Sequence, residues 1–195
     1  MPWDEACVRR IAESERIIRD FVNDRGLYDR HFAAQQDEWH RLCVSMDALG
    51  DTVVALREFE KAGLGANDGE KYLRLYGVLQ AVVLQQDAIQ SLSEIFLGAR
   101  LPPADDSGWQ HLRELRNLSA GHPIRNTSAA RGTIKRVFVS RPSISSKGLT
   151  LMVWDQALGT HSFQHVDLQG LYASYNDEAC ERLRLVSEAQ QSRWP

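Results

Sequence analysis

The feature that most constrains the fold of this chain is a long, almost uniformly apolar helical stretch near its middle. Residues 69–97 read GEKYLRLYGVLQAVVLQQDAIQSLSEIFL, and their apolar side chains would cover most of the circumference of a helix. A helix that is apolar on nearly all sides is buried by several neighbours, so this stretch predicts the central helix of a helical domain. Asn67 or Asp68 is expected to cap its start, and Gly98 is expected to end it.

Three further helices are predicted from apolar residues that recur at spacings of three and four. They span residues 3–23, 29–61 and 108–120. Gly50 is a point at which the second of these helices could bend or break. Ser107 followed by Gln110 has the spacing of a capping box, which favours a helix start at this point. The aromatic residues are expected mostly in the core, with Trp39 and Tyr76 as leading examples.

The character of the sequence changes after residue 133. Apolar and β-branched residues alternate with polar ones over residues 133–167, and turn signals interrupt them twice. A helical pattern returns over residues 168–191. We therefore predict a mainly α fold (α+β), in which a helical bundle contains a small antiparallel β-meander inserted before the C-terminal helix. The length suits a single domain, 1–195, with the bundle and its motif in residues 1–123.

Basic residues gather in one part of a chain that is acidic overall. The net charge is −3, yet residues 112–147 contain eight Lys and Arg against the single acid Glu114, which leaves 15 basic and 25 acidic residues elsewhere. Such a stretch suggests a surface that meets an anion, while the acidic remainder keeps the protein soluble. The alternative is a loop-rich region that is basic by chance. The low net charge excludes a general polycation that coats nucleic acid.

The cysteines and the N-terminus indicate the cellular location and the cofactors to expect. Cys7, Cys43 and Cys180 are odd in number and show no Cys-x-x-Cys spacing, so neither a disulfide framework nor a zinc site is expected. Reduced thiols favour a cytoplasmic location. The N-terminus does not resemble a signal peptide, and the longest apolar run, Val78–Leu84, is too short to span a bilayer. We expect no membrane contact, no metal and no other cofactor.

The segment Arg116–Pro123, which reads RNLSAGHP, carries the side chains best suited to chemistry. Arg116 offers a planar fork of donors that matches a phosphate, and His122 titrates near neutral pH. On one continuous helix the two side chains would point about 120° apart. Gly121 relaxes the backbone, and Pro123 disfavours helical geometry at His122. We therefore expect the helix to end there and His122 to turn back beside Arg116.

This pair of side chains is suited to metal-free cleavage of RNA. A base removes the proton of a ribose 2′-hydroxyl, an acid protonates the leaving 5′-oxygen, and an arginine stabilises the charge that builds on phosphorus. Since acid and base are usually different groups, a symmetric homodimer would supply the second histidine across a shared cleft. Alternatively, His122 only caps the helix through its dipole. Arg116 would then pair on the surface with Asp105 or Asp106.

Residues Leu112–Pro123 resemble the signature of the HEPN superfamily (higher eukaryotes and prokaryotes nucleotide-binding), in which an Arg, often followed by Asn, precedes a His by a short gap. The resemblance implies a small helical bundle that dimerises. In many members it implies a metal-independent ribonuclease of toxin–antitoxin, abortive-infection or other defence systems. By position, it implies catalytic roles for Arg116 and His122 and a supporting role for Asn117. The meander over residues 133–167 departs from the minimal family pattern.

The motif and the resemblance lead to two functions, besides the alternative of a purely structural helical partner protein. The first is a metal-independent endoribonuclease of a bacterial defence or toxin–antitoxin type, which acts on RNA as a homodimer and has an antitoxin or a second effector protein as a further partner. The second is a non-catalytic HEPN-like module that binds RNA, a nucleotide or another protein.

Other residues are candidates around the catalytic pair. Asp87 and Gln80 are seven residues apart and therefore lie on one stripe of the central helix. Asp87 is expected to supply a buried carboxylate that orients Arg116 or His122, unless it faces water or pairs locally. Trp109 is expected in the core, unless it stacks on a base or lies at a dimer interface. Contacts to RNA are expected from Arg113, Arg125, Arg131 and Arg136.

Overall fold

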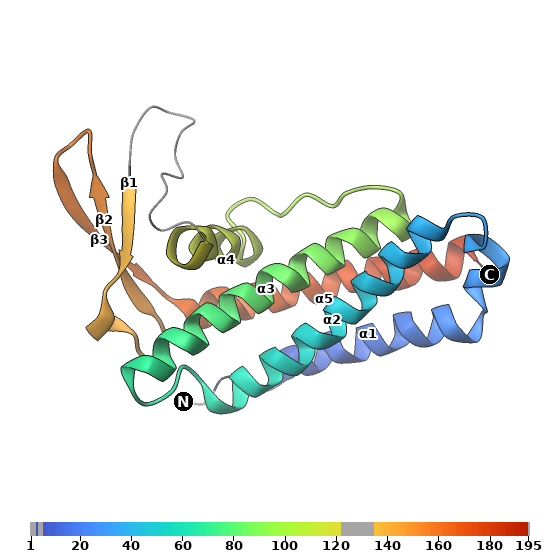
Figure 1. The fold of residues 1–195 in the computed structure, drawn as a ribbon, viewed down its shortest axis with the longest axis horizontal. Coiled ribbons are helices and arrows are strands. Elements are labelled where there is room, and N and C mark those ends of the chain that lie inside the picture. The colour runs from blue at the N-terminus through green and yellow to red at the C-terminus, as the bar shows by residue number, and fades with distance from the viewer. Residues whose placement is uncertain (1–2, 4–5, 122–134, 195) are drawn as a thin grey trace.

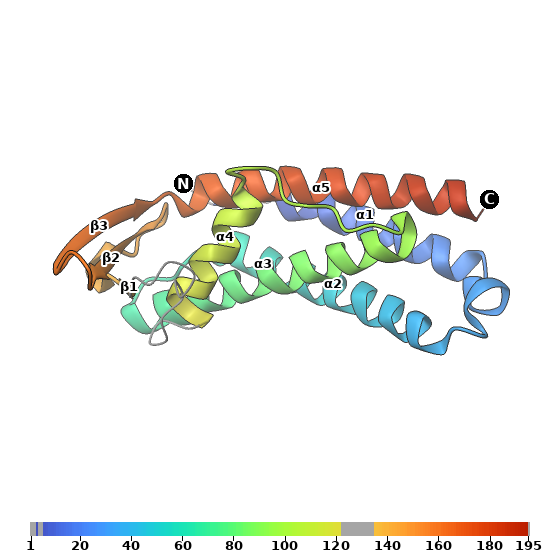
Figure 2. The ribbon, with the colours of Figure 1, turned by 90° about the horizontal axis from the view of Figure 1, so that it is seen from above.

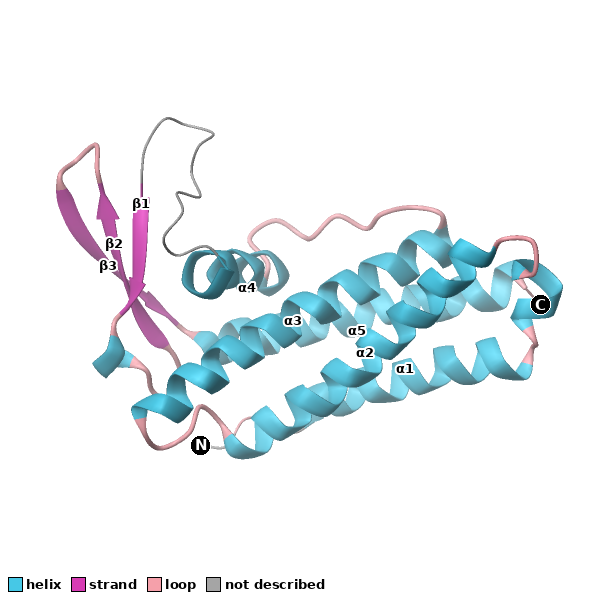
Figure 3. Ribbon diagram, in the orientation of Figure 1, coloured by secondary structure: helices cyan, strands magenta, loops and turns pink. Residues whose placement is uncertain are grey.

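The computed structural model describes Trp3, residues 6–121 and residues 135–194, and shows a bundle of long helices with a short helix and a small sheet at one end (Figure 1). The long helices are α1 (Ala6–Asp24), α2 (Gln36–Ala62), α3 (Asp68–Leu97) and α5 (Leu168–Arg193). The short helix α4 (Gly108–Arg116) continues as a π-helical turn, η2 (Asn117–Gly121). The strands β1 (Lys135–Val139), β2 (Leu149–Asp155) and β3 (Thr160–Val166) precede α5 (Figure 3).

The long helices pack in a closed ring, in which α1 contacts α2, α2 contacts α3, α3 contacts α5, and α5 contacts α1. The short helix α4 packs on both α3 and α5 and crosses α3 when the bundle is seen from above (Figure 2). Because α2 is held between α1 and α3, it runs through Gly50 without a break. No helix in the described part of the chain combines the length and apolar character needed to cross a bilayer.

Both ends of α3 agree with the sequence signals. The side chain of Asn67 accepts a hydrogen bond from the backbone N–H of Glu70, which satisfies one of the otherwise unpaired donors of the first turn. Gly98 adopts a left-handed conformation (φ 71°) and donates its N–H to the carbonyl oxygen of Glu94. Most apolar residues between these caps are buried. Tyr76 is an exception, because it is 40% exposed and so does not belong to the core as predicted.

The helix predicted over residues 29–61 is divided in two. A π-helical turn, η1 (Tyr28–Phe32), is followed by a short turn before α2 begins. The division lets an aromatic cluster form at this end of the bundle, where the ring of Phe32 lies 5.8 Å from that of Trp39 and 5.6 Å from that of Trp194. Packing of these rings against the end of α5 therefore overrides the helical pattern of the sequence.

The predicted meander is a three-stranded antiparallel sheet with the strand order β1-β2-β3. Val137 lies opposite Val153, and Val153 lies opposite Ser162, which defines the register of the strands. The inward face carries buried apolar residues that join the core of the bundle, namely Val137, Leu149, Leu151 and Val153. The predicted fold class, mainly helical with a small antiparallel meander before the C-terminal helix, is confirmed.

The start of α4 approaches the backbone of α5 so closely that only glycine fits. A Cβ atom on Gly108 would lie 2.5 Å from the carbonyl oxygen of Leu171 and 2.6 Å from the backbone nitrogen of Tyr175. We expect Gly108→Ala to lower the free energy of unfolding by about 2–3 kcal/mol, because the two helices must move apart. Urea unfolding measures the change, and an unaltered stability would contradict this packing.

The matched control for this substitution is Gly77→Ala on α3. A Cβ atom on Gly77 would meet no atom within 4 Å. Alanine is the better helix former, so we expect this variant to be more stable than the wild type by about 0.5–1 kcal/mol.

Candidate functional site

The short helix α4 carries the first residues of the motif and holds them against α3. The side chain of Ser107 caps its N-terminus, as the capping-box spacing predicts. Leu112 and Leu115 are buried in the core. Arg113 and Arg116 each follow one of these leucines in the chain, and both reach glutamine side chains of α3. The apolar residues of α4 therefore determine which side chains of α3 the two arginines can contact.

The guanidinium of Arg116 is held by two neutral side chains. Its Nε and Nη2 atoms donate to Oε1 of Gln80 on α3, at 3.0 and 2.9 Å, and its Nη1 atom donates to Oδ1 of Asn117 at 3.0 Å. An arginine has five N–H groups, so its partners among the described residues leave one N–H on each terminal nitrogen. Among the residues that the structure describes, no carboxylate bonds to Arg116. Gln80 and Asn117 therefore hold the guanidinium in place without neutralising its charge, which suits it to an anionic ligand.

Arg113, one turn earlier on α4, makes a similar contact but is neutralised. Its Nε atom donates to Oε1 of Gln86 at 2.8 Å, and its Nη2 atom donates to the carboxylate of Asp87 at 2.5 Å. Gln86 is completely buried and donates its amide N–H to the carbonyl oxygen of Trp109 at 2.8 Å. A glutamine of α3 thus anchors each arginine, but among the described residues only Arg113 also pairs with a carboxylate. This difference distinguishes Arg116 as the candidate anion-binding residue.

Asp87 is not placed as the sequence suggested. Its side chain is 55% exposed and pairs with Arg113, so it is neither buried nor bonded to Arg116. The reason is the direction of α4, which advances toward the N-terminal end of α3. The last turn of α4 therefore meets Gln80, seven residues before Asp87 on the same stripe. The spacing indicated the correct stripe of α3, but it did not indicate which polar side chain Arg116 would contact.

The surface ion pair considered for Arg116 does not form within the described part of the chain. Asp106 instead lies with its Oδ1 atom 3.1 Å from Nε2 of His111 on α4. His111 and Arg116 are therefore held by different partners, and only Arg116 is anchored to α3.

The chain after Arg116 remains helical, but in a wider form than predicted. The α-helix expected to reach Ala120 ends at Arg116, and the next residues form η2. The hydroxyl of the buried Ser119 donates to the carbonyl oxygen of Leu115 at 2.6 Å and so occupies an acceptor of the preceding turn. Wide turns of this kind are frequent at functional sites.

Gly121, the last residue of η2, lies against the Arg116 guanidinium. A Cβ atom at this position would be 2.9 Å from Nη1 and 3.4 Å from Cζ of Arg116. Because glycine has no side chain, the backbone can approach the guanidinium this closely. His122 follows directly in the chain but lies outside the described residues, as do Arg125 and Arg131.

Two of the basic residues expected to contact RNA, Arg113 and Arg136, lie among the described residues. Arg113 is paired with Asp87 beside α3. Arg136 is exposed on β1, where it lies opposite Trp154 of β2. These two arginines therefore lie on different elements, α4 and β1.

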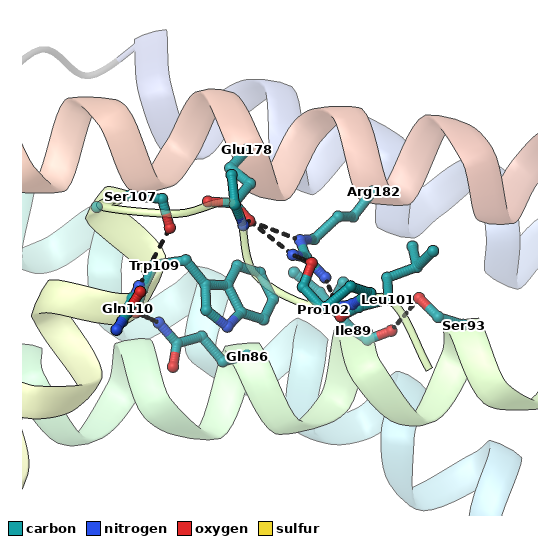
Figure 4. Close-up of polar contacts among 12 residues, drawn as sticks. Gln86, Ile89, Ser93, Leu101, Pro102, Ser107, Trp109, Gln110, Glu178 and Arg182 are labelled. Atoms are coloured by element: carbon teal, nitrogen blue, oxygen red, sulfur yellow. Dashed lines mark hydrogen bonds and ion pairs between the residues drawn. The ribbon is translucent and has the colours of Figure 1, made fainter. Parts of the chain in front are cut away.

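A cavity of about 490 Å³ lies beside the motif. It is bounded by α3, by α4 and by the loop that joins them, and Asn117 is among its lining residues. The loop is held by Arg182 of α5, which donates to the carbonyl oxygens of Leu101 and Pro102 at 2.8 and 2.7 Å (Figure 4). The volume is in the range of pockets that bind small ligands such as nucleotides.

Trp109 belongs to the core, as the preferred interpretation of the sequence predicted. It is 5% exposed, and the guanidinium carbon of Arg182 lies 4.2 Å from the centre of its ring. The ring of Tyr175 is 5.5 Å away on another side. Trp109 therefore anchors α4 and is not available to stack on a base.

The geometry of the candidate site is the basis for assigning a function. No protein-family model, curated protein or solved structure matches the chain. Within residue 3 and residues 6–121 and 135–194, no three His, Cys, Asp or Glu side chains are grouped so that they could hold a metal ion. The candidate site therefore consists of Arg116 with the neighbours that position it.

Proposed function

We propose that this protein is a metal-independent endoribonuclease of a bacterial defence or toxin–antitoxin type, which acts as a homodimer with Arg116 and His122 as catalytic residues. The observation that carries the proposal is the Arg116 guanidinium, which is anchored by neutral acceptors and, among the described residues, keeps an N–H on each terminal nitrogen. A phosphodiester fits such a fork well, because two of its oxygens can accept in parallel. The resemblance of the motif to that of HEPN proteins supports the same class of ligand.

The proposed reaction uses the ribose 2′-hydroxyl as the nucleophile. A general base removes its proton, and the 2′-oxygen forms a bond to phosphorus. The bond between phosphorus and the 5′-oxygen breaks as a general acid donates a proton to that oxygen. The products are a 2′,3′-cyclic phosphate and a 5′-hydroxyl. Arg116 donates its two remaining N–H groups to the phosphate oxygens, on which negative charge increases in the transition state.

His122 is proposed as the residue that moves the protons. An imidazole titrates near neutral pH, and one peptide bond joins His122 to Gly121, which contacts the Arg116 guanidinium. One imidazole acts as the base, and the reaction also needs an acid. In a homodimer, the same histidine of the second copy supplies the acid across a shared cleft. Asn117 accepts from Nη1 of Arg116 and so positions the guanidinium.

We further propose RNA as the substrate and the cytoplasm as the location. Cys43 and Cys180 are unpaired, and burial raises the pKa of each thiol, which keeps both protonated and poorly reactive. Unpaired thiols are the usual state in a reducing cytoplasm. An active ribonuclease inside the cell that makes it needs restraint, so an antitoxin or a second effector protein is proposed as a partner.

Cleavage of RNA in the presence of EDTA tests the proposal. We expect the purified full-length protein to cut RNA in excess EDTA, because no step requires a metal ion. His122→Ala should lower the cleavage rate by roughly 10²–10⁴-fold. His111→Ala is the matched control, since His111 pairs with Asp106 and should keep the wild-type rate. RNA that stays intact at an excess of wild-type protein, or an equal loss in both variants, would contradict the proposal.

A second candidate function is a non-catalytic module that binds RNA, a nucleotide or another protein. The observation that favours it is the cavity of about 490 Å³ beside Asn117, because its volume suits a nucleotide. A module of this kind would bind RNA with a marked salt dependence and release it unchanged.

A further inference from the structure

The outward face of the meander is rich in aromatic residues, although the solvent side of an antiparallel sheet usually carries polar groups. In one row across the strands, Phe138 lies opposite Met152, and Met152 lies opposite Phe163. Phe138 is 49% exposed and Phe163 is 69% exposed. The neighbouring row on the same face consists of Arg136, Trp154 and His161. We call these six residues the aromatic face.

Strand alternation explains why these side chains are turned outward. The residues between them, such as Val137 and Val153, are buried in the core, so the alternate positions must point away from the bundle. The rings of Trp154 and His161 lie 4.7 Å apart and pack on each other. The sheet stands at one end of the molecule, and no described helix covers its outer side in either view (Figures 1 and 2). The rings of Phe138 and Phe163 are therefore accessible to a ligand, and Trp154 is half-buried.

The polar groups of the aromatic face favour an anionic ligand. Arg136 is exposed, and His165 shares the side of β3 that carries His161. The one acidic residue within the strands, Asp155, belongs to the opposite set of alternate positions. Its Oδ1 atom accepts hydrogen bonds from backbone N–H groups of the following turn. The outward positions of the strands thus combine rings, a cation and imidazoles without a carboxylate.

We propose that the aromatic face binds a single-stranded nucleic acid, with bases stacked on Phe138, Phe163 and Trp154 and a phosphate held by Arg136. Every base has a flat π surface, so stacking on exposed rings stabilises a single strand whatever its sequence. A protein partner would bury the same rings. However, protein surfaces carry charges of both signs, whereas the charge of the aromatic face complements the uniformly anionic backbone of a nucleic acid.

The position of the sheet relates this surface to the Arg116 site. β1 contacts η2, and α4 lies at the same end of the bundle as the sheet (Figure 1). In identifying the strand as the RNA substrate, the inference rests on the proposed function, because the same strand would then also have to reach Arg116. Binding of the strand does not itself require cleavage, so the two can be tested apart.

Fluorescence anisotropy with a short, labelled 2′-O-methyl RNA tests the inference, because this probe lacks the 2′-hydroxyl and cannot be cut. We expect Phe138→Ala combined with Phe163→Ala to raise the Kd of the full-length protein for this probe roughly tenfold or more, since two stacked bases lose their support. Leu158→Ala is the control. Leu158 is apolar and 72% exposed, but it lies in the turn between β2 and β3, and its replacement should leave the Kd unchanged.

Circular dichroism establishes that each variant is folded before its Kd is compared. Failure of the wild type to bind the probe, or equal Kd values for the wild type and the double variant, would overturn the inference. A wild-type dimer that dissociates in the double variant, with the Kd unchanged, would assign the face to a second copy instead.

Loss of binding in the double variant, with RNA left intact by the wild type, would support the aromatic face and remove the proposed ribonuclease activity. If the double variant binds the probe as tightly as the wild type, and the wild type cleaves RNA, the inference about the aromatic face fails and the proposed ribonuclease activity stands.

Discussion

Replacing Arg116 by alanine is expected to lower the rate of RNA cleavage by about 10²–10³-fold, the usual loss when a donor to a developing negative charge is removed. The two N–H groups that its partners among the described residues leave on its terminal nitrogens are those that would contact the phosphate. The fold should survive, because Arg116 and Gln80 are only partly buried and water can replace their hydrogen bonds. Initial rates with a fluorogenic RNA measure the effect.

Arg113→Ala is the matched control for this variant. Arg113 lies one turn earlier on α4 and is likewise anchored by a glutamine of α3, so its removal causes a similar loss of packing. Its pairing with Asp87 leaves it less suited to stabilise a phosphate, and we expect its rate to fall by less than about tenfold. The cleavage rate of Arg116→Lys should lie between the rates of Arg113→Ala and Arg116→Ala, because a lysine supplies charge without the planar fork. Equal rates for Arg113→Ala and Arg116→Ala would contradict the assignment.

Arg182→Ala is expected to lower the free energy of unfolding by about 3–5 kcal/mol, as is typical when one partner of a buried ion pair is removed. The Arg182 side chain is 6% exposed and bonds to the carboxylate of Glu178 at 2.6 Å. Its guanidinium also lies over Trp109 and bonds to the loop that precedes α4 (Figure 4). Without it, the Glu178 carboxylate and two carbonyl oxygens lose their donors in a poorly solvated place.

Urea unfolding measures this effect, and the control is Arg184→Ala on the same helix. Arg184 pairs with Glu181 and Glu188 on the exposed side of α5, where solvent screens the interaction. Its removal should change the stability little. If Arg182→Ala proved no more destabilising than Arg184→Ala, the proposed role of Arg182 in holding the loop and α4 would be wrong. Because α4 carries Arg116, we also expect Arg182→Ala to reduce any cleavage activity.

The long elements could be predicted because local signals and tertiary packing agree there. Asn67 and Gly98 have the conformations that helix ends require, and they occur where the apolar pattern of α3 starts and stops. The strands follow from alternation, since Val137 and Val153 are buried between outward residues. In contrast, η1 forms because Phe32 packs against the ring of Trp194, which is distant in the sequence.

The candidate site could be predicted only in part. The sequence singles out Arg116 and Asn117 by their chemistry, and it predicts Asp87 as the residue that positions Arg116, whereas Gln80 does so in the structure. The point along the stripe at which α4 crosses α3 depends on both helix surfaces, so the spacing alone does not indicate which polar side chain Arg116 contacts. A helix with apolar residues on most sides likewise does not indicate which of them, such as Tyr76, stay exposed. No sequence signal distinguished Arg182, whose burial depends on Trp109 and the loop before α4.

The ends of the RNA products formed in EDTA provide the most direct test of Arg116 and His122 as a metal-free pair that activates a 2′-hydroxyl. Mass spectrometry should find a 2′,3′-cyclic phosphate at each new 3′ end, and a strand with 2′-deoxyribose at the cut site should stay whole. New ends that carry a 3′-hydroxyl, or efficient cutting of the deoxy-substituted strand, would contradict this account.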